Sequence, residues 1–128
     1  MTLVVVWMTT VTQNLTLYRG ITFDSFLIKC FQDDALTIPQ DITGWVPWAE
    51  VRTAPDQLLI LNLNPAISNA AQGIVTIPAI QDEQTILLPE GKFKWDYTMQ
   101  DPGGQRFGPY VRGSFVIKSK ITQGAPPE

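Results

Sequence analysis

The sequence contains no histidine, and this absence excludes several common kinds of site. None of the 128 residues is histidine, so catalytic triads with an imidazole base, histidine–metal sites and imidazole switches near neutral pH are excluded. The single cysteine, Cys30, excludes an internal disulfide framework and a cysteine-rich zinc site. We therefore expect no catalytic residues, no cofactor and no metal ion.

Charge is also scarce in this chain. Charged residues make up 16% of the sequence and hydrophobic residues 45%, whereas an average soluble protein is about 25% charged. This composition excludes a disordered chain, and 128 residues are enough for one domain with its own core. The net charge of −3 argues against binding of nucleic acid through its phosphates.

The N-terminal apolar run is too short to span a membrane. It covers only residues 3–8, whereas a membrane-spanning helix needs about 20 residues, and the basic region and cleavage site of a signal peptide are missing. The β-branched Val4, Val5 and Val6 favour a strand instead. We expect no membrane contact, and we interpret residues 1–12 as an N-terminal strand or arm for contact between subunits.

The dominant period of the sequence is two, which is typical of β-strands. In residues 92–99, Phe93, Trp95, Tyr97 and Met99 alternate with polar residues. Residues 110–118 alternate in the same way. The two segments predict an antiparallel hairpin with a long loop at residues 101–109.

Similar segments, each ended by turn residues, lie upstream. They predict strands near residues 13–18, 22–31, 45–53, 58–63 and 73–77, and a short helical turn within residues 79–88. Pro47 restricts the first half of its strand to a sheet edge or a bulge. An antiparallel Ig-like β-sandwich of about seven strands explains this pattern, with an up-and-down barrel as the alternative. The sandwich is expected over residues 13–122, followed by a Pro-rich tail at 123–128.

Residues that could support chemistry have simpler explanations. The acidic pairs Asp33-Asp34 and Asp82-Glu83 fall in turn-like stretches that predict solvated side chains. Cys30 shares the phase of apolar neighbours, which predicts a buried and unreactive thiol.

Basic residues recur on the polar side of the last two strands. Lys92, Lys94, Arg112, Lys118 and Lys120 predict a basic sheet face. A solvated face is the favoured interpretation, with a patch for carboxylates or phosphates as the alternative.

Apolar residues outside the expected core predict contact with other proteins. Alternation leaves Leu58, Ile60 and Trp48 on the outside, and monomers rarely expose large apolar patches. The strand around Val4 to Val6 is expected to add to the sheet edge of a neighbour. The candidate assembly contacts are Leu3, Val4, Val5, Val6, Trp7, Trp48, Leu58, Ile60, Arg106, Phe107 and Tyr110.

Six short motifs occur in a defined order along the chain. They are R-G-I-T-F at 19–23, D-I-T-G-W at 41–45, G-I-V-T-I at 73–77, L-P-E-G-K-F-K-W-D-Y at 88–97, D-P-G-G at 101–104 and G-S-F-V-I at 113–117. Over about residues 18–122 the chain resembles a family of small Ig-like proteins from tailed-phage structural operons, related to the N-terminal domain of phage baseplate upper proteins.

This resemblance implies structural attachment and no catalysis. The expected function is that of a non-enzymatic virion structural protein, in the tail, baseplate or fibre attachment, acting by protein–protein assembly. Its expected location is the virion, its expected partners are other virion proteins and copies of itself, and neither nucleic acid nor a small-molecule substrate is expected. Two alternatives stay open: a capsid decoration or cement protein, and a carbohydrate-binding module that contacts a host surface through Trp45 and Trp48.

Overall fold

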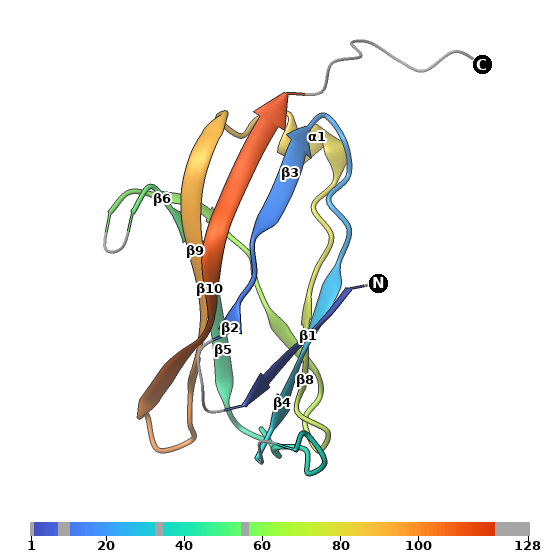
Figure 1. Cartoon of the computed structure of the whole chain (residues 1–128), viewed down its shortest axis with the longest axis vertical. Helices are drawn as coiled ribbons and strands as arrows, with labels where there is room; N and C mark the ends of the chain where they lie inside the picture. Colours follow the sequence, from blue (N-terminus) through green and yellow to red (C-terminus); the bar gives the residue numbers. More distant parts are fainter. Residues whose placement is uncertain (1, 8–10, 33–34, 55–56, 120–128) are drawn as a thin grey trace, which may run out of the picture.

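The computed structural model describes residues 2–7, 11–32, 35–54 and 57–119, and these form two β-sheets packed face to face (Figure 1). The strands of this part of the chain are β1 (Thr2–Trp7), β2 (Val11–Thr12), β3 (Leu15–Arg19), β4 (Phe26–Phe31), β5 (Val46–Arg52), β6 (Leu59–Asn62), β7 (Ala66–Asn69), β8 (Ile74–Ile77), β9 (Gly91–Gln100) and β10 (Arg106–Ser119). The short helix α1 (Asp82–Thr85) lies between β8 and β9 and agrees with the predicted helical turn.

One sheet has the strand order β1-β4-β8-β7, and the other has the order β2-β10-β9-β5-β6 with β3 also paired to β10. The pairs within β4-β8-β7 and β10-β9-β5-β6 are all antiparallel. This division of strands between two sheets is that of an Ig-like sandwich, so the predicted fold class is confirmed. Beyond the seven predicted segments, the structure adds the short strands β2 and β7 and pairs β1 into a sheet.

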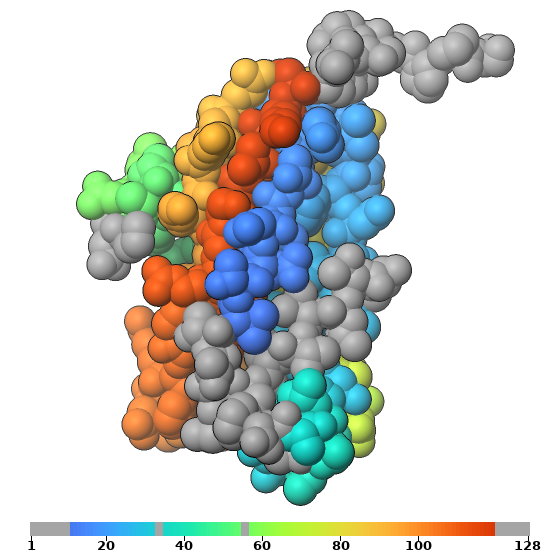
Figure 2. Space-filling view, in the orientation of Figure 1, coloured from blue at the N-terminus to red at the C-terminus, as the bar shows by residue number. Residues whose placement is uncertain are grey.

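The N-terminal residues are part of both sheets. β1 runs parallel to β4, in register from Thr2 opposite Phe26 to Trp7 opposite Phe31, and β2 pairs in parallel with β10. Figure 2 shows the edge of the sandwich where β2 and β3 lie beside β10. The predicted Pro-rich tail lies outside the described residues.

The predicted hairpin is confirmed, but its loop is shorter than expected. β10 begins at Arg106, which pairs with Gln100, so the loop covers residues 101–105 and not 101–109. The turn-forming Gly108-Pro109 sequence is accommodated by an irregularity in the ladder between Phe107 and Val111. Proline cannot donate a ladder hydrogen bond, and an irregularity of this kind accommodates it.

Pro47 lies where β5 has only one neighbour. It pairs with Met99 of β9, whereas β6 joins β5 only from Glu50 onward. The predicted edge position of this proline is therefore confirmed. Its backbone nitrogen has no hydrogen to donate, and this nitrogen faces a side of β5 that no strand of the described chain occupies.

The core lies between the two sheets and consists of the inward-facing residues. Phe93, Trp95, Tyr97 and Met99 of β9 are all buried, as their alternation predicts. They pack with Phe26, Ile28, Cys30, Val75, Ile77, Val111, Phe115 and Ile117 from the neighbouring strands. The outward residues of the same strands are then left to form the surface of the sandwich.

Candidate interaction surface

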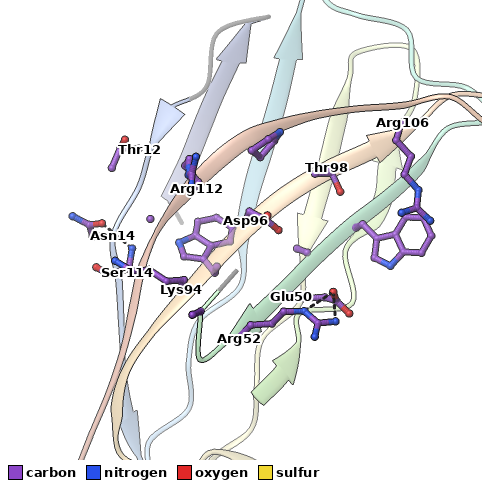
Figure 3. Close-up of a pocket in the computed structure, with 16 residues that line it drawn as sticks. Thr12, Asn14, Glu50, Arg52, Lys94, Asp96, Thr98, Arg106, Arg112 and Ser114 are labelled. Atoms are coloured by element: carbon purple, nitrogen blue, oxygen red, sulfur yellow. Dashed lines mark hydrogen bonds and ion pairs between the residues drawn. The ribbon is translucent and has the colours of Figure 1, made fainter. Parts of the chain in front are cut away.

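The outer face of the six-stranded sheet is hollowed. The hollow has a volume of about 1220 Å³ and is lined mainly by outward residues of β5, β9 and β10. Figure 3 shows Thr12 and Asn14 at one end of it and Arg106 at the other. Because side chains alternate between the two faces of a sheet, the outward polar side chains of these three adjacent strands all face the hollow.

Like charges face each other across the strands in this hollow. Glu50 of β5 lies directly opposite Asp96 of β9, and in the next outward row Arg52 lies opposite Lys94. Arg112 of β10 is the partner of Asp96 on the other side. Like charges in directly opposed positions are destabilising, so these rows need counter-charges.

Arg52 and Glu50 compensate each other within one strand. The Arg52 Nη2 donates to Glu50 Oε1 at 3.0 Å (Figure 3), and Nη1 donates to the Gln57 carbonyl at 2.6 Å. In the described part of the chain, neither Lys94 nor Arg112 has a hydrogen-bond or ion-pair partner. Two cations of the hollow are therefore available to an external anion.

Most basic side chains of the described residues lie on this side of the molecule. We call them the cationic face: Arg52, Lys92, Lys94, Arg106, Arg112 and Lys118. The predicted basic face is confirmed for its members on β9 and β10, because Lys92 and Lys94 alternate with buried residues, as do Arg112 and Lys118. Lys120 lies outside the described residues.

The basic face predicted from the sequence did not include Arg52 of β5 or its acidic neighbour Glu50. The signal was present, because the alternation in residues 45–53 directs both side chains outward. What the sequence lacks is the information that β5 pairs with β9, which brings Arg52 beside Lys94.

Trp48 lines the end of the hollow where Arg106 lies, whereas Trp45 and Phe107 are not part of its lining. The guanidinium of Arg106 lies over the Trp48 ring, 4.6 Å from its centre, and the Trp45 and Phe107 ring centres are 5.7 Å apart. Both tryptophans of the predicted sugar platform thus have a ring or cation partner within the chain. A sugar stacking on the Arg106 side of Trp48 would have to displace that side chain.

The candidate contacts predicted on the β5–β6 side have different exposures. Leu58 is 69% exposed, as expected, and its neighbour Leu59 is 43% exposed. Ile60, which we expected outside the core, is only partly exposed and packs against it. The reason is a bulge: Val51 pairs with Leu61 and Arg52 with Leu59, so Ile60 breaks the simple alternation.

The candidate contacts on β10 also differ in how exposed their side chains are. Phe107 is 37% exposed, whereas Tyr110 packs against the core, with its ring centre 6.3 Å from that of Tyr97. Residues Leu3 to Trp7 pair with β4 through their backbone. Their contact with a neighbouring subunit remains a prediction.

Ionisable groups also occur in the core. Burial raises the pKa of the Cys30 thiol to about 12, and burial raises the pKa of the Tyr97 hydroxyl as well. The predicted buried thiol is confirmed. A thiol that stays protonated at neutral pH is a poor nucleophile.

Two further kinds of feature are absent from the described residues. No three His, Cys, Asp or Glu residues within these ranges gather closely enough to hold a metal ion. No helix in the described chain has the length and apolar character needed to cross a membrane.

Comparison with known proteins gives a similarity in structure only. No family model matches it, and no curated protein matches it. Among solved structures, the cysteine protease inhibitor EhICP2 from Entamoeba histolytica is similar, with 15% sequence identity and a TM-score of 0.43 over 91% of this chain and 96% of the inhibitor. A similarity at this level supports no inference about function.

Proposed function

We propose that this chain is a non-enzymatic structural protein of a tailed-phage virion, in the tail, baseplate or fibre attachment, and that it works by binding neighbouring proteins. The observation that carries the proposal is an uncharged side of the sandwich. Residues 57–81 contain no Asp, Glu, Lys or Arg. This stretch includes β6 and β7, and each of these strands ends its sheet in the described chain.

Edge strands without charges are unusual in a protein that remains alone. An edge exposes unpaired backbone groups, and proteins commonly protect it with lysine, proline or a covering segment. Here Leu58 and Leu59 are exposed next to the edge, at 69% and 43%. Coverage by another protein would remove this apolar surface from water, at about 25 cal/mol per Å².

The backbone of β6 offers a hydrogen-bond donor to such a partner. Leu63 N donates to the Ala49 carbonyl at 3.0 Å, and Leu61 pairs with Val51. In an antiparallel ladder the residue between two bonded positions directs its N–H to the other side. The N–H of Asn62 therefore points away from β5, where a strand of a partner could accept it.

A capsid decoration or cement protein would use the same contacts on another part of the particle. A carbohydrate-binding module is less well supported, because Trp48 and Trp45 already pack against Arg106 and Phe107. Tryptophan fluorescence during titration with host glycans distinguishes this class. A glycan-dependent change that is lost in Trp48→Ala would contradict an assembly function.

Incorporation into particles tests the proposal directly. Particles of the phage that encodes the chain are purified and analysed by mass spectrometry, with the wild type replaced by Leu58→Lys or by the control Ile38→Lys. Ile38 is also exposed, at 53%, but it is distant from β6 in the sequence, whereas Leu58 directly precedes β6. We expect the wild type and the control in particles, and at least about tenfold less Leu58→Lys, because a lysine would be buried in the contact. Absence of the wild type from particles refutes the proposal. Incorporation of Leu58→Lys at the wild-type level would show that the edge at β6 is not the contact with neighbouring proteins.

A further inference from the structure

The net charge of the chain conceals a separation of charges over its surface. The cationic face has six basic side chains and only two acidic ones, Glu50 and Asp96, which gives it a charge of +4. The other described residues include two basic and six acidic side chains, a charge of −4. Such a molecule has a strongly cationic side and an anionic remainder, so electrostatic attraction favours contact between unlike surfaces of two copies.

The densest group of acids among the described residues follows β8. We call residues 81–90 the acidic corner; it contains Asp82, Glu83 and Glu90 and no basic residue. It also exposes apolar surface, because Leu87 is 81% exposed and Ile86 is 45% exposed. α1 lies in this corner at one end of the sandwich (Figure 1).

The two surfaces do not neutralise each other within one molecule. No ion pair in the described part of the chain joins the acidic corner to the cationic face; Glu90 instead lies 3.9 Å from Arg19 of β3. Lys94 and Arg112, in the hollow, have no ion-pair partner among the described residues. Both surfaces are thus available for contact with another molecule.

We propose that the cationic face binds the acidic corner of a second copy of this chain. This inference rests on the proposed function, because it assigns one partner of an assembly protein. The hollow can accept a projecting corner, and its exposed Lys94 and Arg112 can pair with the carboxylates of that corner. The carboxylates of Glu50 and Asp96 within the hollow disfavour a uniformly anionic ligand such as nucleic acid.

The contact joins two different surfaces of the same chain. Each copy therefore keeps one free cationic face or one free acidic corner after a single contact forms. Contacts of this type continue until a ring closes or produce an open row. This is the geometry that a repeated component of a larger particle requires.

Sedimentation velocity of the purified full chain tests the contact. In about 0.01 M salt, where the screening length is about 30 Å, we expect the mean sedimentation coefficient to rise with protein concentration. In about 1 M salt, where that length is about 3 Å, we expect monomers. A chain that stays monomeric at low salt refutes the inference, whether or not it enters particles.

Two charge-reversal variants identify the surfaces. Lys94→Glu/Arg112→Glu changes the cationic face and Asp82→Lys/Glu83→Lys changes the acidic corner, and all four side chains are exposed. We expect each variant to associate at least about tenfold more weakly than the wild type at low salt, and Asp24→Lys, outside both surfaces, to associate normally. Circular dichroism verifies that each variant is folded.

The mixture of the two variants is the decisive sample. The first variant keeps an intact acidic corner and the second keeps an intact cationic face, so an equimolar mixture should associate although neither variant associates alone. A mixture that remains monomeric contradicts the inference. Wild-type association that Leu58→Lys abolishes and both charge variants retain also contradicts it, as does binding of single-stranded DNA by a chain that does not self-associate.

Discussion

Gly113 of β10 is a position that cannot accept a side chain. A Cβ at this residue would lie 2.8 Å from the Gln13 carbonyl carbon and 2.9 Å from Asn14 Oδ1. The segment between β2 and β3 lies here against β10, bonded by Trp95 Nε1 to the Gln13 oxygen at 2.8 Å and by Ser114 N to Asn14 Oδ1 at 3.0 Å. Glycine thus permits the close approach that joins the N-terminal segment to the sheet.

We expect Gly113→Ala to reduce the free energy of unfolding by about 1–3 kcal/mol, the usual cost of overpacking. Gly103→Ala is the matched control, because the nearest atom to its Cβ would be 3.4 Å away; a change within about 0.5 kcal/mol is expected there. Urea unfolding followed by tryptophan fluorescence measures both. Equal stabilities of the two variants would show that the N-terminal segment can shift without cost.

The buried thiol of Cys30 makes stability depend on alkaline pH. Burial raises its pKa from 9.0 to about 12, so above pH 9 the unfolded chain loses a proton that the folded chain keeps. The stabilising contribution is complete below pH 9 and is lost as the pH rises toward 12, at up to about 1.4 kcal/mol per pH unit. Cys30→Ala should flatten the decline between pH 9 and 10 in urea unfolding series. An unchanged slope in this variant would assign the decline to other groups.

At the scale of elements, α1 is joined to the turn after β3 by one buried polar residue. Thr85 is fully buried; its Oγ1 accepts a hydrogen bond from Gly20 N at 3.0 Å and lies 3.0 Å from the Ile21 carbonyl, to which it can donate. The helix itself has only four residues, too few to be stable alone. Its position, and with it that of the acidic corner, therefore depends on these bonds.

Thr85→Val keeps the shape of the side chain and removes the hydroxyl. We expect a loss of about 1 kcal/mol in the free energy of unfolding, because two part-buried backbone groups, Gly20 N–H and the Ile21 carbonyl, lose their partner. Thr22→Val, at an exposed position of the same turn region, is the control and should be nearly neutral. Thermal and urea unfolding compare the two, and a neutral Thr85→Val would mean that water replaces the hydroxyl.

The elements also show what the sequence could predict. The strong alternation of apolar and polar residues predicted the strand β9, its buried face and its outward lysines. A period of two residues is enough to determine all three features. β7 was missed because Ala66, Ser68 and Asn69 are more typical of a turn, and its strand form depends on pairing with β8. The position of Ile60 and the grouping of Arg52 with Lys94 depend on a bulge and on strand order, which local pattern does not contain.

At the scale of the whole molecule, the sandwich is closed on the β4 side by its own N-terminal strand. β1 pairs with β4 along its full length, from Thr2 to Trp7, and it ends the sheet. The predicted role of residues 1–12 in contacts between subunits therefore depends on whether β1 stays on β4 or pairs with another copy.

We expect a chain without residues 1–7 to remain folded and to self-associate, because the deletion exposes the backbone edge of β4. Circular dichroism reports the fold and light scattering the association. Addition of a synthetic peptide of residues 2–7 should suppress the association by restoring the edge. Unfolding of the shortened chain would show instead that β1 is required for the core.

The parallel pairing of β3 with β10 determines how the molecule carries a mechanical load. Five residue pairs connect these strands, from Leu15 with Phe115 to Arg19 with Ser119. Tension applied between the two ends of the chain would pull the strands in opposite directions along their shared axis. All the connecting hydrogen bonds would then be sheared together and not opened one after another, so the sandwich should resist stretching through this pair of strands.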